Sequence, residues 1–320
     1  MDSNSKLHVI FGAGPLGMAV MRELVARGAS SNGTRIRMVN RSGKAGVPAG
    51  VEVLPGDASR PEDARRLAQG AAVVYQCSNP PYNRWPELFP ALQAGILEGA
   101  AASGAKLVVA ENLYMYGEVN GPLTEDLPYT AITRKGQVRA RMAEALFAAH
   151  RSGKVRMAIA RAADFYGPGV LGSAMGDRVF YPMLAGKAAS VAGDIDAPHS
   201  YTFIDDFAKA LVELGERDEA LGQAWHVPSA ETLSTRQFLA LAFELAGLPP
   251  KISVMGRLMM TLGGLFIPAA REMVEMLYEF EKPFIVDSRK YEQAFGIHGT
   301  PLRDALSKTL DWYKIHPQAQ

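Results

Sequence analysis

The sequence has almost no cysteine. Cys77 is the only one among 320 residues, which excludes an internal disulfide and a cysteine-rich zinc site and fits a protein of a reducing cytosol. A free cysteine inside an apolar run is usually buried, so Cys77 is predicted to serve packing. The six histidines show no metal-ligand spacing, so the sequence predicts no metal site.

An excess of one charge and a long apolar run are also missing. The net charge is only +1, which predicts neither nucleic-acid nor anionic-membrane binding. The most apolar segment, 258–270, is shorter than the roughly 20 residues that span a bilayer, and it contains Gly263, Gly264 and Pro268. Residues 1–6 are polar and carry no signal-peptide pattern. We therefore expect a soluble, cytoplasmic protein.

A glycine pattern near the N-terminus predicts a dinucleotide site. The apolar run 7–11 ends at Gly12, and two further glycines complete the spacing G-x-G-x-x-G. The first glycine permits a tight turn, the second lets the backbone approach a pyrophosphate, and the third lets a helix pack close to the strand. Helical spacing follows, and then a strand-like run at 34–39, as a β-α-β unit requires. The predicted binding residues are Gly12, Gly14, Pro15, Leu16 and Gly17. The alternative is a purely structural turn.

The end of the second predicted strand favours NADP(H) over NAD(H). The residues there are Asn40, Arg41 and Ser42. An acidic side chain at this place would bond the ribose hydroxyls of NAD. A guanidinium instead binds a 2′-phosphate with two hydrogen bonds. NAD(H) remains the alternative, in which Arg41 is a solvated residue on a turn.

Two further strand ends supply candidate ligand contacts. Asp57 follows the third predicted strand, where it would accept a hydrogen bond from the adenine amino group or cap its own turn. Ser78, Asn79 and Pro80 follow the fourth, at the strand edge where open α/β sheets bind ligands. Tyr82 and Trp85 come next, and the sequence leaves open whether they line the substrate site or only pack.

The order of elements predicts an α/β fold. Six apolar runs alternate with helical segments, which is typical of a Rossmann-type, doubly wound parallel sheet. The runs cover 7–11, 34–39, 51–57, 71–77, 106–110 and 155–160. We expect an NAD(P)-binding domain over 1–169, with 200–228 packing back on it. A smaller, mostly helical substrate domain is expected over 170–320.

These residues resemble the extended short-chain dehydrogenases/reductases, also described as NAD-dependent epimerases/dehydratases. The resemblance covers most of the chain. Its markers are the turn 12–17, Asp57, Tyr116-Gly117, the segment 161–169 and the segment 199–206. The resemblance implies a two-domain enzyme with NAD(P) on the first domain. It also implies a catalytic serine or threonine with a tyrosine and a lysine spaced Tyr-x-x-x-Lys, in which the lysine lowers the pKa of the tyrosine and holds the nicotinamide ribose.

The chain departs from that catalytic pattern. Lys135 lies on the expected helix, but Ala131 stands where the tyrosine belongs and Asn112 where the serine belongs. Asn112 can orient a carbonyl oxygen but does not shuttle a proton as a hydroxyl does. Tyr114 is our first candidate for the acid or base, and packing is its alternative. Other tyrosines that could enter the site are Tyr116, Tyr129 and Tyr166. Lys135 is expected to hold the ribose, and a solvated helix lysine is its alternative.

The sequence is compatible with two functions. The first is an NADP(H)-dependent oxidoreductase or epimerase that acts on a carbonyl, hydroxyl or activated alkene of a small organic substrate. Tyr82, Trp85, Tyr116, Tyr166 and His199 are its predicted substrate contacts. The second is a catalytically silent NADP(H)-binding sensor, which the missing tyrosine favours. The apolar content of helices 87–102 and 138–149 would suit a homodimer.

Overall fold

The computed structural model describes residues 6–28, 33–264 and 272–318. The chain forms two compact units. Unit 1 comprises residues 1–115, 134–161 and 207–225. Unit 2 comprises residues 116–133, 162–206 and 226–320. Segments 116–133 and 162–169, which the sequence analysis assigned to the first domain, thus belong to unit 2.

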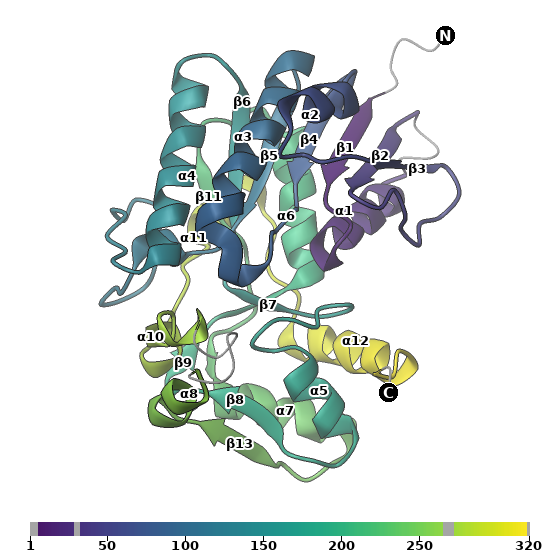
Figure 1. The fold of residues 1–320 in the computed structure, drawn as a ribbon. Coiled ribbons are helices and arrows are strands. Elements are labelled where there is room, and N and C mark those ends of the chain that lie inside the picture. The colour runs from purple at the N-terminus through teal and green to yellow at the C-terminus, as the bar shows by residue number, and fades with distance from the viewer. Residues whose placement is uncertain (1–5, 29–32, 265–271, 319–320) are drawn as a thin grey trace. The chain divides into compact units, whose positions relative to one another are not determined.

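A seven-stranded sheet in the order β11-β6-β5-β4-β1-β2-β3 forms the centre of unit 1 (Figure 1). Neighbouring strands from β6 to β3 pair in parallel. The strands are β1 (Leu7–Phe11), β2 (Arg35–Asn40), β3 (Val51–Pro55), β4 (Ala71–Gln76), β5 (Lys106–Glu111), β6 (Arg156–Arg161) and β11 (Ala224–His226). The predicted Rossmann-type sheet is confirmed. Its strand order reverses between β1 and β4, and ligands bind at such a point in open α/β sheets.

Helices cover both faces of this sheet because its central strands are apolar on both sides. On one face, strand residues such as Val9, Val74 and Leu107 form a core with three helices. These helices are α2 (Pro61–Ala68), α3 (Trp85–Ser103) and α4 (Arg134–Arg151). On the other face lie α1 (Pro15–Ala26) and α6 (Ile204–Glu216). There Tyr75 reaches α6, where a Cβ on Gly215 would stand 2.6 Å from its hydroxyl.

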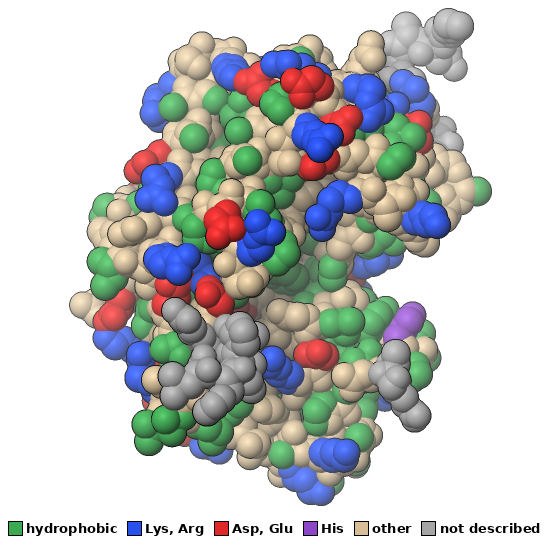
Figure 2. All heavy atoms as spheres, viewed as in Figure 1, with side chains coloured by type: hydrophobic (Ala, Val, Ile, Leu, Met, Phe, Trp, Pro, Cys, Tyr) green, Lys and Arg blue, Asp and Glu red, His purple; other side chains and the backbone are tan. Residues whose placement is uncertain are grey.

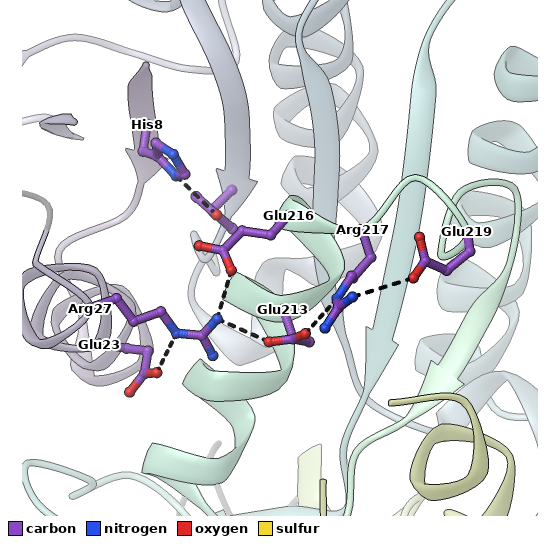
Figure 3. Close-up of polar contacts among 8 residues, drawn as sticks. His8, Glu23, Arg27, Glu213, Glu216, Arg217 and Glu219 are labelled. Carbon is purple, nitrogen blue, oxygen red and sulfur yellow. Dashed lines mark hydrogen bonds and ion pairs between the residues drawn. The ribbon is translucent and has the colours of Figure 1, made fainter. Parts of the chain in front are cut away.

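A network of ion pairs joins α1 to α6 (Figure 3). Arg27, just after α1, donates to Glu23 at 2.7 Å, to Glu213 at 2.9 Å and to Glu216 at 2.8 Å. Burial disfavours the charge of Arg27, but these carboxylates outweigh it and raise its pKa. Arg217 supplies Glu213 with a second cation at 2.7 Å. The network fixes the end of α1 opposite its glycine turn.

Unit 2 is built from short elements around its own apolar core. Three two-stranded sheets pair β7 (Asp164–Tyr166) with β10 (Tyr201–Phe203), β9 (Pro198–His199) with β12 (Leu233–Ser234), and β8 (Ala189–Ala192) with β13 (Ile252–Met255). Its helices include α5 (Asp177–Leu184), α7 (Thr235–Ala246), α8 (Arg257–Gly264), α10 (Tyr278–Glu281), α11 (Arg289–Phe295) and α12 (Leu302–Ile315). Their buried faces meet in a core that contains Phe180, Phe238 and Leu306.

Among the described residues, no helix is both long and apolar enough to cross a bilayer. Part of the apolar segment 258–270 forms α8, and its residues 265–270 lie outside the described residues, as do residues 1–5 of the polar N-terminal segment. On the face drawn in Figure 2, the basic and acidic side chains are interspersed. This distribution agrees with the near-zero net charge.

Candidate active site

Two of the three fingerprint glycines are required by the packing of unit 1. Gly12 has a φ of +114°, and a Cβ there would stand 2.8 Å from the backbone of Cys77 and Ser78. A Cβ on Gly17 would stand 2.0 Å from the carbonyl oxygen of Gly12. The N–H of Gly12 donates to the carbonyl of Val39 at 2.9 Å. The turn is therefore held between β2 and the residues after β4, with α1 packed directly on it.

Gly14 is different, because the fold gives no reason for a glycine there. Its φ of −76° and ψ of −175° suit any residue. Within the described part of the chain, no atom outside its immediate neighbours would lie within 4 Å of a Cβ at this position. No side chain caps α1, and its first turn has no acidic residue. A helix start of this kind suits a phosphate. The turn therefore fits a dinucleotide pyrophosphate, for which Gly14 gives the needed approach.

The end of β2 leaves Arg41 exposed, while its neighbours bond within their own turn. The Oδ1 of Asn40 accepts the N–H of Gly43 at 2.7 Å and the hydroxyl of Ser42 at 3.1 Å. Its Nδ2 donates to the carbonyl of Lys44 at 2.8 Å. Asn40 and Ser42 thus shape the turn that presents the guanidinium of Arg41 to solvent.

Asp57 acts as a turn cap in this structure. Its Oδ1 accepts the hydroxyl of Ser59 at 2.6 Å and the backbone N–H of Ser59 at 3.0 Å. These hydrogen bonds hold the pKa of Asp57 below its usual value, and the charges of Arg60 and Arg41 act in the same direction. Arg41 is therefore in electrostatic reach of Asp57, so the two strand ends form one local environment.

An aromatic–cation cluster occupies the carboxyl ends of β4 and β5. It consists of Tyr82, Trp85, Phe89, Tyr114, Lys135 and Arg139, which come from η1 (Tyr82–Arg84), α3, η2 (Tyr114–Tyr116) and α4. The hydroxyl of Tyr82 donates to that of Tyr114 at 3.3 Å. The Nζ of Lys135 lies 4.5 Å from the ring centroid of Tyr82. The structure thus brings the predicted lysine and the predicted tyrosine into one cluster, with Tyr82 between them.

Trp85 holds the aromatic part of this cluster together. Its indole N–H donates to the carbonyl of Pro80 at 3.2 Å. Its ring lies 5.0 Å from that of Tyr82, 5.2 Å from that of Phe89 and 5.8 Å from that of Tyr114. The loop that follows β4, with Ser78, Asn79 and Pro80, is therefore fixed to the cluster. Because the same loop adjoins Gly12, the glycine turn and the cluster share one edge of the sheet.

A buried ion cluster lies beside the aromatic residues. Glu111, at the end of β5, is 3.3 Å from Arg139 and 3.1 Å from Arg161, and all three side chains are at most 1% exposed. Burial lowers the pKa of Arg139, and the charge of Glu111 opposes this shift. Sequence reasoning missed Glu111 and Arg161 as partners. The one available signal was the four-residue spacing of Lys135 and Arg139 on a single helix face.

Asn112 has a local role next to Tyr114. Its Oδ1 accepts the backbone N–H of Tyr114 at 3.4 Å, and its side chain is partly exposed. The side-chain amide therefore stands at the same strand end as the candidate acid. Burial raises the pKa of the Cys77 thiol, which follows β4, to about 12, so the sulfur stays protonated at neutral pH.

The predicted substrate contacts of unit 2 are buried within that unit. Tyr116 bonds the Nε2 of His226 at 2.9 Å, and its ring is inaccessible. Tyr166 packs on Phe203 and Phe238 in the core, and burial raises its pKa. His199 bonds the Oδ2 of Asp164 at 3.0 Å and stacks on Phe280 and Phe284. The described residues contain no group of three or more His, Cys, Asp or Glu that could hold a metal ion.

Solved structures with this fold are similar to the chain along nearly its whole length. The crystal structure of gox2253 has a TM-score of 0.79 at 17% identity, covering 97% of this chain and 98% of that one. A dTDP-glucose 4,6-dehydratase from Bacillus anthracis, in complex with NAD, has a TM-score of 0.78 at 13% identity, with 97% of each chain covered. A UDP-glucuronic acid 4-epimerase from Bacillus cereus, also with NAD, has a TM-score of 0.76 at 17% identity, covering 97% and 99%.

Sequence comparison gives the family. No curated protein sequence matches the chain with significance. The NAD dependent epimerase/dehydratase family matches residues 9–227, which is more than half of the chain and contains the glycine turn, Lys135 and the segment 199–206. The chain belongs to the NAD dependent epimerase/dehydratase family, whose members are enzymes that depend on a nicotinamide dinucleotide.

Proposed function

We propose that this protein is an NADP(H)-dependent oxidoreductase or epimerase that acts on a carbonyl or hydroxyl group of a small organic substrate. The observation that carries the proposal is the aromatic–cation cluster at the carboxyl ends of β4 and β5. In this cluster Tyr114, our candidate acid or base, is hydrogen-bonded to Tyr82, and Lys135, which matches the family's lysine, lies over the Tyr82 ring. The cluster stands on the same sheet edge as the dinucleotide turn.

The phosphate groups of the cofactor are bound at two places in this chain. The turn at Gly14 and the start of α1 receive the pyrophosphate, because they offer backbone N–H groups and open approach. Arg41 binds the 2′-phosphate of NADP(H), since a guanidinium forms two charge-assisted hydrogen bonds to such a group. The absence of a carboxylate at residues 40–42 supports NADP(H), because a carboxylate there would repel the 2′-phosphate.

The protein supplies proton transfer and orientation. When bound, the nicotinamide ring donates or accepts the hydride. In the reducing direction Tyr114 gives its hydroxyl proton to the substrate oxygen, and in the oxidising direction it takes that proton back. The side-chain amide of Asn112 orients the same oxygen by a hydrogen bond. Lys135 contributes a buried positive charge beside the tyrosines and holds the nicotinamide ribose.

A catalytically silent NADP(H) sensor is the second candidate. The specific observation in its favour is the pair of replacements at Ala131 and Asn112, which removes two hydroxyls of the family's catalytic pattern. The two candidates share the cofactor site and differ only at the cluster. Turnover of any carbonyl substrate with NADPH separates them.

Gly14→Ala and Gly17→Ala form a matched pair that tests the cofactor turn. Gly14→Ala should leave the melting temperature unchanged, because its Cβ meets no described atom, and should weaken NADPH binding by about tenfold or more. Gly17→Ala should instead cost about 1–3 kcal/mol of stability, because its Cβ collides with the carbonyl of Gly12. Calorimetric unfolding and fluorescence titration measure the two effects. Unaltered NADPH affinity in a folded Gly14→Ala protein would contradict the site.

Arg41→Ala tests the choice of cofactor. The loss of a charge-assisted pair of about 1.5–3 kcal/mol should weaken NADPH binding by about 10- to 100-fold, while NADH binding stays within about twofold. Arg35→Ala is the control, because Arg35 carries the same charge at the opposite end of β2. Equal losses for NADPH and NADH in Arg41→Ala would rule out selection by the 2′-phosphate.

Tyr114→Phe tests the chemistry. On a substrate found with a panel of aldehydes, ketones and activated alkenes, the variant should lose about 10²- to 10⁴-fold in kcat, the usual contribution of a general acid. Its NADPH affinity and melting temperature should be unchanged, because the ring remains. Full activity of Tyr114→Phe would remove Tyr114 from the mechanism. Tight NADPH binding without turnover of any panel member would favour the sensor.

A further inference from the structure

We propose that Tyr82 is a positioning residue that passes a proton between solvent and Tyr114 under the charge of Lys135. The inference rests on the proposed function, in which Tyr114 is the acid or base. In a Tyr-x-x-x-Lys pair, the tyrosine and the lysine lie on adjacent turns of one helix. Here Tyr82, in η1 after β4, connects Lys135 with Tyr114 instead.

The hydroxyl groups of the two tyrosines are already in contact. Tyr82 donates to the oxygen of Tyr114 at 3.3 Å, although 32 residues separate them in the sequence. When Tyr114 has given its proton to a substrate, its oxygen becomes a stronger acceptor and the same contact shortens. A proton can then move along this hydrogen bond without movement of either ring.

Lys135 lies where it favours loss of the proton from Tyr82. Its ammonium nitrogen is 4.5 Å from the centroid of the Tyr82 ring, and its side chain is only 2% exposed. A cation over an aromatic face is attracted by the ring electrons. Ionisation of the phenol spreads negative charge into the ring, so this attraction grows, and burial of the lysine limits its screening by water.

The surrounding charges and rings support the same role. Two cations from α4 lie in this cluster: Lys135 is over the Tyr82 ring, and the charge of Arg139 interacts with Tyr114. Arg139 pairs with Glu111, which also pairs with Arg161. The positive charges of Lys135 and Arg139 favour a phenolate on the tyrosine pair. Trp85 contacts both tyrosine rings, and its indole N–H donates to the carbonyl of Pro80. Trp85 therefore holds the two rings in positions in which their hydroxyl groups can meet.

Protons are conserved in both directions of the reaction. In reduction the O–H bond of Tyr114 breaks and a new O–H bond forms on the substrate, whose carbon receives the hydride. Tyr114 then takes the hydroxyl proton of Tyr82. The Tyr82 phenolate, which is partly exposed, takes a proton from water. Oxidation of an alcohol runs the same transfers backwards and releases one proton to solvent.

Tyr82→Phe tests this relay, because it keeps the ring over which Lys135 lies and removes only the hydroxyl. On a panel substrate we expect kcat to fall by about 10- to 100-fold, with KM and NADPH affinity within about twofold. The double variant Tyr82→Phe/Tyr114→Phe should be no slower than Tyr114→Phe alone. Tyr181→Phe is the matched control, since the hydroxyl of Tyr181 donates to the carbonyl of His316 at an exposed site of unit 2.

The outcomes separate the relay from the proposed function. If Tyr114→Phe is inactive while Tyr82→Phe keeps the wild-type kcat, the relay is wrong and Tyr114 remains the acid. If Tyr82→Phe raises KM and leaves kcat unchanged, Tyr82 is a substrate contact and the relay is again wrong. If Tyr114→Phe is fully active, the proposed acid itself is wrong, and the relay is wrong with it.

A spectroscopic measurement tests, without any substrate, the hydrogen bond that the relay requires. Phenolate absorbance is measured against pH in the wild type, Tyr114→Phe, Tyr82→Phe and the double variant. The difference between the wild type and Tyr114→Phe gives the titration of Tyr114 with the Tyr82 hydroxyl present. The difference between Tyr82→Phe and the double variant gives the titration of Tyr114 without that hydroxyl. Because Tyr82 donates a hydrogen bond to the Tyr114 oxygen, the phenolate should form at a higher pH when that hydroxyl is gone. Superimposable curves would overturn the proposal.

Discussion

The close approach of α1 to the turn at Gly12 is the contact on which the rest of unit 1 depends. The backbone at Gly17 lies so near the Gly12 carbonyl that no side chain fits between them. This turn also packs against the residues after β4, and its backbone forms a hydrogen bond to β2. At its far end α1 is held to α6 by Arg27 and three carboxylates (Figure 3). A helix fixed at both ends points its N-terminus at the edge of the sheet where the strand order reverses, a direction that suits phosphate binding.

The same sheet edge carries the aromatic–cation cluster. The loop after β4 packs beside the glycine turn and leads directly to Tyr82 and Trp85, so one short segment joins the glycine turn to the aromatic–cation cluster. A buried carboxylate, Glu111, between two arginines anchors α4 to the ends of β5 and β6. Because α4 also carries Lys135, this ion cluster sets the position of the lysine charge. Tyr82 and Tyr114 come from η1 and η2 outside this helix, and Tyr82 lies under the lysine while it bonds Tyr114.

The sequence predicted much of the fold because the periodicity of apolar residues and the spacing of glycines are local signals. The six expected strands lie within a residue or two of the observed ones, and the helices of unit 1 follow the predicted spacing. Contacts between distant segments were not predictable in this way. Tyr82 and Tyr114 meet only through tertiary packing, and the pairing of Glu111 with Arg161 depends on the register of β5 with β6. Charged residues such as Arg139 also read as solvent-facing in a sequence, although this one is buried.

The most direct test of the account is a fluorescence titration of the unmodified protein with NADPH and with NADH. We expect saturable NADPH binding, with NADH weaker by about tenfold or more because it lacks the 2′-phosphate that Arg41 is proposed to bind. Equal affinities would contradict the cofactor preference. Failure of both nucleotides to bind would contradict the central claim, because the turn at Gly14 would then have no ligand to explain it.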